Sequence, residues 1–360
     1  MTKTFSSTST VTIQPWVLSL GGGVAQLPLI EAAKQKGFAV CIVDQNSNCI
    51  ASRHADNFIH ASTHDHKTIL ATLAELALPI HAVLARTSGQ ALYTAAIIDR
   101  KFKLRGLDEY LVTLCTTKSE LRKYCQTHSI PVPDGAAYDP KQPIPQLPVV
   151  IRPDFPIRGK HSVALCNLSN QIKQAINSAK SVSANGKADI ATFIDGSDIS
   201  LLAQVNRGNV TPIAWWEEVN QFDQANLKAL GLIFPAHISP EVKQQLVEAA
   251  NKFAEGFPEL NYVLAFSFRV DKQLSAKLIE VHADLTGDQI LDTLLPAATK
   301  RNVLSEIMSG LLGGSFPDYT KGETIPTALK FESNEAKLIQ SSSVPELIQL
   351  LKNDIGVQAS

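Results

Sequence analysis

The sequence lacks the features that would place it in several large classes of protein. Its 360 residues carry 33 Lys plus Arg against 34 Asp plus Glu, so there is no basic surplus of the kind that binds nucleic acid. No apolar run approaches the ~20 residues that a membrane-spanning helix needs. Residues 1–12 are rich in Ser and Thr, and Gly21–Gly23 breaks the apolar stretch that follows, which makes a poor secretory signal. We therefore expect no nucleic-acid partner and no membrane partner.

Paired cysteines are also missing. The five cysteines are odd in number and show no CxxC spacing, a pattern typical of reduced thiols in a cytoplasmic protein. Buried or inert thiols are a better explanation for them than a catalytic one. With 44% hydrophobic and 19% charged residues, the chain has the composition of a globular protein, and its length suits two or three domains.

Residues 15–115 have the alternating pattern of a parallel α/β domain. Apolar runs at 16–20, 38–43 and 81–85 predict buried strands, and helical periodicity at 26–36 and 65–78 separates them. Ligands gather at the carboxyl ends of such strands, where Gly21–Gly23, Asp44 and residues 86–88 are expected. The glycines could touch a substrate or simply form the turn, and Asp44 is better explained as the cap of a turn. A dinucleotide-dependent oxidoreductase would fit this domain alone, but no GxGxxG turn is present.

The chain changes character at residue 116. Residues 116–187 predict a small α+β unit with helices at 118–128 and 169–182, a proline-rich link between 140 and 148, and strands at 149–153 and 162–166. Residues 188–312 predict strands at 189–194, 199–205, 210–216 and around Phe266 and Ile279, a helix at 240–257, and a helical pattern from 288 to 312. We expect residues 1–14 to be a flexible N-terminus and residues 313–360 a polar extension with one helix at 344–352.

Four short segments carry a resemblance to a known superfamily. They are T-K-S-E-L-R at 117–122, V-V-I-R-P at 149–153 with R-G-K at 158–160, T-F-I-D-G-S-D-I-S at 192–200, and L-I-E-V-H-A-D-L-T-G-D at 278–288. In this order and spacing they resemble the ATP-grasp superfamily, especially its carboxylate–amine ligases and their relatives in purine synthesis and biotin-dependent carboxylation. The resemblance implies an α/β and α+β architecture. Its parts would be an N-terminal parallel α/β domain, a small lid subdomain and an antiparallel-sheet core.

The resemblance also implies a reaction. It would be the ATP- and magnesium-dependent joining of a small carboxylate to an amine through an acyl phosphate, in a protein that is commonly a homodimer. Such chemistry brings several negative groups together, so Lys or Arg must neutralise the phosphates and magnesium must bridge them. A closing loop has to exclude water from the acyl phosphate.

The resemblance assigns the phosphates to three cations. Lys118 and Arg152 stand at two phosphate-binding positions, and Lys160 lies in the loop expected to cover the phosphates. Lys160 and Asp288 are the expected catalytic residues.

The remaining assignments concern the adenine and the metal. The adenine is expected along Ile190, Thr192 and Phe193, with Asp198 as a nearby supporting carboxylate. Glu280 is the expected magnesium ligand and His282 a second candidate ligand. An unpaired carboxylate at the end of an apolar strand would be costly, which itself favours a ligand or ion-pair role for Glu280.

Three positions depart from the superfamily pattern. Ala191 stands where an acidic residue commonly holds the ribose, Ser267 where a second metal ligand is usual, and Asp284 where arginine is usual. These departures favour an alternative: a catalytically degenerate relative that binds a nucleotide or serves as a partner subunit. A second carboxylate near the metal, with Glu217, Glu218 and Asp284 as candidates, would separate the two hypotheses.

Two further clusters have competing explanations. His54, His60, His64 and His66 lie close together, but they match no metal-ligand spacing, so a solvated polar loop is favoured. The segment 215–218, W-W-E-E, could line a substrate pocket or simply pack at the end of a strand.

Overall fold

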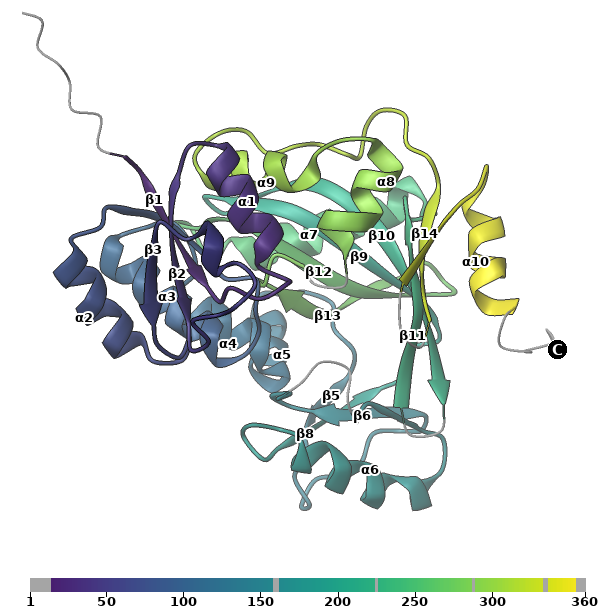
Figure 1. Ribbon diagram of the computed structural model, residues 1–360. Helices are drawn as coiled ribbons and strands as arrows, with labels where there is room; N and C mark the ends of the chain where they lie inside the picture. The colour runs from purple at the N-terminus through teal and green to yellow at the C-terminus, as the bar shows by residue number, and fades with distance from the viewer. Residues whose placement is uncertain (1–13, 158–161, 224–225, 287–288, 333–335, 354–360) are drawn as a thin grey trace, which may run out of the picture.

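The computed structural model describes residues 14–157, 162–223, 226–286, 289–332 and 336–353. Three sheets organise the chain: a four-stranded sheet at the N-terminus, a small four-stranded sheet, and a seven-stranded sheet. Figure 1 shows the N-terminal sheet on one side of the large sheet and the small sheet projecting below both. The fold is therefore the expected combination of a parallel α/β domain with antiparallel α+β parts.

The N-terminal sheet is parallel, with strand order β3-β2-β1-β4. Its elements are β1 (Trp16–Leu20), α1 (Leu27–Gln35), β2 (Ala39–Asp44), the short 3-10 turn η1 (Ser52–His54), β3 (Asn57–His60), α2 (His66–Leu76), β4 (Ile80–Leu84) and α3 (Gln90–Phe102). The central strands are almost entirely buried, which explains why they read as unbroken apolar runs. The strand and helix predictions for this region are confirmed, and β3 and α3 were missed.

Local signals fix the ends of these elements. The side chain of Asp65 caps α2 by accepting hydrogen bonds from the backbone N–H of Thr68 at 3.1 Å and from its hydroxyl at 2.7 Å. Asp44 closes the turn after β2, because its carboxylate accepts from the N–H of Gly22 at 2.9 Å and of Asn46 at 2.8 Å. Asp44 therefore caps a turn, as predicted.

The small sheet is antiparallel, in the order β5-β8-β6-β7. Two helices, α4 (Glu109–Thr116) and α5 (Lys118–Thr127), lead into it, and its elements are β5 (Gly135–Ala137), β6 (Val149–Pro153), β7 (Ala164–Cys166), α6 (Ser169–Ser181) and β8 (Ala188–Thr192). It has its own apolar core, in which Ile151 and Ile190 pack against Ile176 and Ala179 of α6. We call this unit the lid.

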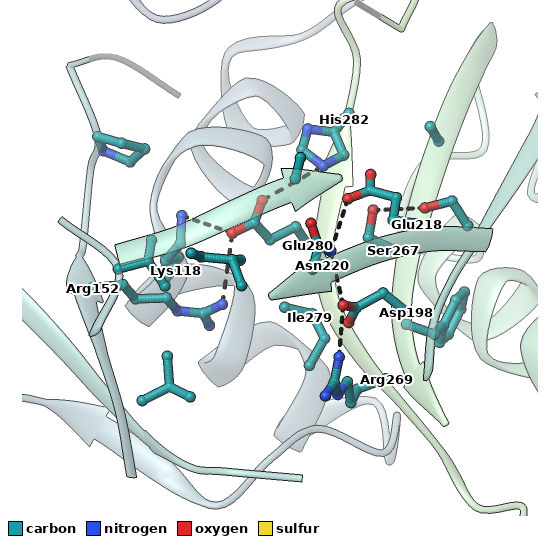
Figure 2. Close-up of a pocket in the computed structure, with 18 of the residues that line it drawn as sticks. Lys118, Arg152, Asp198, Glu218, Asn220, Ser267, Arg269, Ile279, Glu280 and His282 are labelled. Carbon is teal, nitrogen blue, oxygen red and sulfur yellow. Dashed lines mark hydrogen bonds and ion pairs between the residues drawn. The ribbon is translucent and has the colours of Figure 1, made fainter. Parts of the chain in front are cut away.

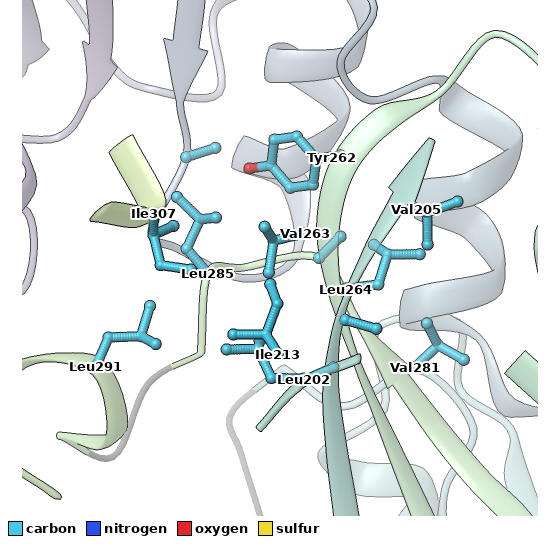
Figure 3. Close-up of a cluster of buried hydrophobic side chains, with 14 of the residues drawn as sticks. Leu202, Val205, Ile213, Tyr262, Val263, Leu264, Val281, Leu285, Leu291 and Ile307 are labelled. Atoms are coloured by element: carbon cyan, nitrogen blue, oxygen red, sulfur yellow. The ribbon is translucent and has the colours of Figure 1, made fainter. Parts of the chain in front are cut away.

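The large sheet is antiparallel, in the order β13-β12-β9-β10-β11-β14-β15. Its elements are β9 (Gly196–Asn206), β10 (Asn209–Asp223), β11 (Asn226–Phe234), α7 (Pro240–Ala254), β12 (Asn261–Asp271), β13 (Ala276–His282), the π-helical turn η2 (Ile290–Leu294), α8 (Leu295–Thr299), α9 (Val303–Leu311), β14 (Thr327–Phe331), β15 (Ala336–Gln340) and α10 (Val344–Asn353). Figure 3 shows Leu202 and Val263 of the sheet beside Leu285, Leu291 and Ile307 from the segments that cover it.

Two expectations for the C-terminal third need correction. The helical pattern from 288 to 312 is not one helix: Lys300 adopts a left-handed conformation with φ 57°, and Asn302 starts a new helix by accepting from the N–H of Ser305 at 3.2 Å. The region after Gly313 contains the predicted helix as α10, but also β14 and β15, which extend the large sheet beyond β11.

In the part of the chain described here, no helix is long and apolar enough to cross a membrane.

Candidate functional site

A cavity of about 700 Å³ lies where the lid, the large sheet and the N-terminal domain meet. Side chains from all three line it: Lys118 and Arg152 from the lid side, Glu280 from β13, and Ser88 with Gly89 from the N-terminal domain. Figure 2 shows Lys118 and Arg152 converging on Glu280. The cavity therefore brings together residues that lie far apart in the sequence.

Glu280 is the centre of the charged group at the lid end. Its Oε1 lies 3.0 Å from Nζ of Lys118 and 3.6 Å from Nη1 of Arg152, and its Oε2 lies 3.5 Å from Nε2 of His282. Burial raises the pKa of Glu280, but the positive charges around it, that of Lys118 first, outweigh burial and hold the pKa well below its ordinary value. Glu280 is therefore an ionised carboxylate with cationic neighbours.

Arg152 is fixed from behind by a buried carboxylate. Its Nε donates to Oδ2 of Asp189 at 3.0 Å, and Nη2 of Arg122 donates to the same atom at 3.1 Å. Asp189 is fully buried; burial raises its pKa, but the two guanidinium groups, Arg152 foremost, lower it further than burial raises it. This buried group ties α5 to β6 and β8 and orients Arg152 toward Glu280.

Asp198 lies on β9, two strands from Glu280 in the same sheet, and belongs to a second polar group. Its Oδ2 accepts from Nη1 of Arg269 at 2.6 Å and from Nδ2 of Asn220 at 2.9 Å, and Nδ2 of Asn220 also reaches Glu218 at 3.3 Å. The guanidinium of Arg269 lies over the ring of Phe193, 5.4 Å from its centroid. Asp198 therefore holds the guanidinium of Arg269 in place over the ring of Phe193.

A row of polar residues crosses the large sheet beside Glu280. The register pairs Glu280 with Ser267, Ser267 with Ser200, and Ser200 with Trp216, and the two serine hydroxyls lie 3.1 Å apart. Glu218 lies two residues beyond Trp216 on β10. Three strand spacings of ~4.8 Å and two residues of ~3.3 Å along the strand put its backbone about 16 Å from that of Glu280.

The other candidate carboxylates are placed differently. Glu218 lines the cavity, whereas Glu217 on the opposite face of β10 is buried beneath α10, where burial raises its pKa and Lys352 partly offsets the rise. Within the residues that the structure describes, no three His, Cys, Asp or Glu side chains come close enough together to hold a metal ion. That finding includes the histidines between residues 54 and 66.

Seven of the residues expected at the site line this one cavity. They are Lys118, Arg152, Thr192, Phe193, Asp198, Glu280 and His282. The side chain of Ile190 instead packs in the core of the lid, so a role for its backbone stays a prediction. Lys160 and Asp288 lie outside the described residues, and their catalytic roles also stay predictions.

The end of the cavity nearest the N-terminal domain contains Asp284, one of the candidate carboxylates named from the sequence. Asp284 and Thr286 line it, and each has a buried side-chain oxygen without a hydrogen-bond partner among the described residues. Leu285 and Thr286 both have positive φ, 54° and 46°, which is unusual for non-glycine residues and rarer still for a β-branched one. The turn that presents Asp284 is therefore strained.

Arg86 secures this turn. Its guanidinium donates to the carbonyl of Thr286 at 3.1 and 3.3 Å, to the carbonyl of Ala25 at 3.1 Å, and pairs with Asp292 at 3.1 Å. The sequence placed Arg86 on a ligand-binding edge of the parallel sheet, but its side chain is 4% exposed and is used to join the N-terminal domain to the large sheet. A lone Arg after a buried strand was the signal, and two of its partners, Thr286 and Asp292, lie about 200 residues away.

Comparison with known proteins gives a consistent result at the level of the fold. No family model matches the chain, and no curated protein matches it in sequence. Solved structures do match. An L-amino acid ligase from Bacillus licheniformis aligns with a TM-score of 0.70 at 15% identity, over 88% of this chain and 79% of that one. The chain has the ATP-grasp fold.

Two further structures share this fold and contain nucleotide. An N5-carboxyaminoimidazole synthetase from Staphylococcus aureus complexed with ADP aligns with a TM-score of 0.71 at 13% identity, over 94% of this chain and 96% of that one. The second is the biotin carboxylase domain dimer of 2-oxoglutarate carboxylase from Hydrogenobacter thermophilus, in complex with MgADP, ADP and bicarbonate. It aligns with a TM-score of 0.68 at 14% identity, over 88% of this chain and 74% of that one. The resemblance read from the sequence is confirmed, and identities this low establish the fold alone.

Proposed function

We propose that this protein binds ATP in the cavity and uses it to join a small carboxylate to an amine through an acyl phosphate. The observation that carries the proposal is the convergence of Lys118 and Arg152 on Glu280, inside a cavity of about 700 Å³. The fold supports it, because other proteins with this fold have been solved with ADP. A cavity of this volume is within the range of small-molecule sites.

Lys118 and Arg152 would hold the phosphates. Both side chains lie mostly within the protein, at 11% and 10% exposure, where a charge interaction is screened less than it is at the surface. Phosphates compete with Glu280 for these two cations, so nucleotide binding would shift their ion pairs from the carboxylate to the ligand. Asp189 keeps Arg152 oriented during that exchange.

Glu280 is the residue that would hold magnesium. Magnesium is usually bound by one or two carboxylates together with phosphates and waters, so one carboxylate with an ATP ligand suffices. The ion would neutralise the phosphate charge. His282 was also expected as a ligand, but its Nε2 lies 3.5 Å from Oε2 of Glu280, and imidazole prefers transition metals to magnesium.

The other predicted residues have supporting places in this proposal. Phe193 and Thr192 line the cavity at the lid, where we place the adenine, and Asp198 holds Arg269 against Phe193. Lys160 and Asp288 remain the proposed catalytic residues. A homodimer remains the proposed assembly.

Titration of ATP into the purified protein, with and without magnesium, tests the proposal. We expect Lys118→Met to weaken ATP binding by about tenfold or more, since it removes a charged hydrogen-bond donor. Lys141→Met is the matched control, because Lys141 is an exposed lysine of the lid outside the cavity. ADP release on adding mixtures of carboxylates and amines would then identify the reaction. Equal ATP affinity in the two variants would refute the phosphate site.

One observation favours a second function, a nucleotide-binding protein without ligase activity. Ser267 lies directly opposite Glu280 in the sheet, so the neighbouring strand offers a hydroxyl where it could have offered a second carboxylate. ATP binding that is independent of magnesium, with no ADP release in any mixture, would favour this function over the ligase.

A further inference from the structure

The two ends of the cavity differ in the pairing of their charged side chains. At the lid end Lys118 and Arg152 surround Glu280, and further along the wall Arg269 pairs with Asp198. Past His282 the cavity is lined by Asp284, whose Oδ1 is buried and accepts no hydrogen bond from the described residues. The lid end thus has its charges matched, and the Asp284 end has a carboxylate oxygen without a partner.

Strand geometry sets the distance between the two ends. Glu280, His282 and Asp284 alternate along β13 and its continuation, and all three line the cavity. Four residues of extended chain span about 13 Å, so a nucleotide phosphate at Lys118 and a group at Asp284 would not overlap. Asp284 therefore belongs to a separate subsite of the same cavity.

The surroundings of Asp284 favour positive charge. Its carboxylate lies close enough to Cys115 that, after burial, its charge contributes to raising the pKa of that thiol. Cys115 and Thr116 are the last residues of α4, and both line the cavity beside Asp284. Thr286, 5% exposed, adds a hydroxyl oxygen that also lacks a partner.

Leaving buried acceptors unpaired is unfavourable, and a bound donor would remove that cost. A carboxylate ligand would be repelled by Asp284 and could not donate to it. An ammonium or guanidinium group supplies several N–H donors and an opposite charge, so it matches both unpaired oxygens.

We propose that the Asp284 end of the cavity is a subsite for a cationic group carried by the small-molecule substrate. This inference rests on the proposed function, because it assigns the cavity a substrate beside the nucleotide. The cation is a recognition handle and not the reacting nitrogen, since an amine must be unprotonated to attack an acyl phosphate. The substrate class is therefore a small molecule with a second basic group, such as a diamine or a basic amino acid.

Calorimetric titration of agmatine and 1,4-diaminobutane, without nucleotide, tests the subsite. Succinate and 1,4-butanediol are the matched anionic and neutral probes. We expect the cationic probes to bind with dissociation constants of roughly 1–10 mM or tighter, and Asp284→Asn to weaken them about tenfold or more. Asp139→Asn removes an exposed carboxylate of the lid and should leave binding unchanged. Thr286→Val provides a second variant in case Asp284→Asn does not fold.

The outcomes separate this inference from the ligase proposal. Cation binding that depends on Asp284, in a protein that fails to bind ATP, would retain the subsite and reject the proposed function. ATP binding that depends on Lys118, with succinate bound as tightly as agmatine, would support the proposed function and reject the subsite. The subsite is also refuted if no cationic probe binds in that concentration range, or if Asp284→Asn binds them as the wild type does.

Discussion

The two ends of the cavity differ in how their polar groups are satisfied. At the lid end, Glu280 has cationic neighbours and Asp189 is paired with Arg122 and Arg152. At the N-terminal-domain end, Asp284 and Thr286 each keep a buried oxygen without a partner among the described residues. At the lid end a ligand must displace existing ion pairs, whereas at the other end it can supply hydrogen bonds that are missing. Mutations at the two ends should therefore change stability and ligand binding differently.

The largest loss of stability is expected at Asp189, the most buried carboxylate of the lid network. Asp189→Asn leaves the guanidinium groups of Arg122 and Arg152 buried without their carboxylate, which should lower the free energy of unfolding by about 3–5 kcal/mol. Urea unfolding at neutral pH measures it. Asp195→Asn, which breaks an exposed pair with Lys272, is the control and should cause no measurable change. A loss below about 1 kcal/mol in Asp189→Asn would show that the network contributes little.

Behind the other end lies Asp99, a buried carboxyl group that should make stability depend on pH. Burial raises the pKa of Asp99 to about 8, although the N–H of Leu107 donates to it at 2.7 Å. In the unfolded chain the group ionises near pH 4, so the free energy of unfolding should fall as pH rises from about 4 to about 8, at about 1.4 kcal/mol per pH unit.

Asp99→Asn removes that ionisation and should flatten this part of the curve, which thermal or urea unfolding across the pH range would reveal. The comparison uses the slope with pH, because the substitution itself changes stability at every pH. A wild-type slope retained in Asp99→Asn would mean that another group is responsible.

Glu280→Gln tests whether the carboxylate competes with phosphate for Lys118 and Arg152. Glu280 has a side chain that is 32% exposed, so we expect only about 1 kcal/mol of lost stability. ATP binding measured without magnesium should tighten by about three- to tenfold because both cations are released. The stimulation of binding by magnesium should disappear. Weaker ATP binding without magnesium would contradict the competition.

The smallest effect concerns single hydroxyl groups and should differ in sign between two threonines. Thr286→Val removes a buried hydroxyl that has no partner, and should stabilise the ligand-free protein by about 0.5–1 kcal/mol. Thr327→Val removes a hydroxyl that donates to the carbonyl of Ile325 at 2.8 Å, and should destabilise it by about 1 kcal/mol. Urea unfolding of both variants measures the two changes in the free energy of unfolding. A loss of stability in both would mean that the Thr286 hydroxyl is satisfied in solution.

Much of the fold follows from local patterns in the sequence. Unbroken apolar runs predicted the parallel strands because both faces of that sheet are covered, and helical periodicity predicted α1, α2, α5, α6, α7 and α10. Four short segments, taken in order, predicted the ATP-grasp fold and seven of the residues that line the cavity. These signals are readable because each depends on neighbours in the chain.

Other features depended on pairing between distant segments. Strand β14 reads as an ordinary short polar-apolar stretch, and only its pairing with β11 makes it part of the large sheet. Glu217 and Glu218 are equivalent in the sequence, and the register of β10 against β9 decides which one enters the cavity. A shift of one residue would exchange them, since successive side chains of a strand point to opposite faces.

Local sequence patterns were enough to predict the fold and to single out Lys118, Arg152 and Glu280 at the lid end. Two features emerged only from the packing of distant segments: Arg86 holds the turn at Thr286, and Asp284 lines the cavity while its buried Oδ1 has no partner among the described residues. The physical reason is that propensity and periodicity act over a few residues. Burial, ion pairing and unmet hydrogen bonds are set by groups that meet only when distant segments pack together.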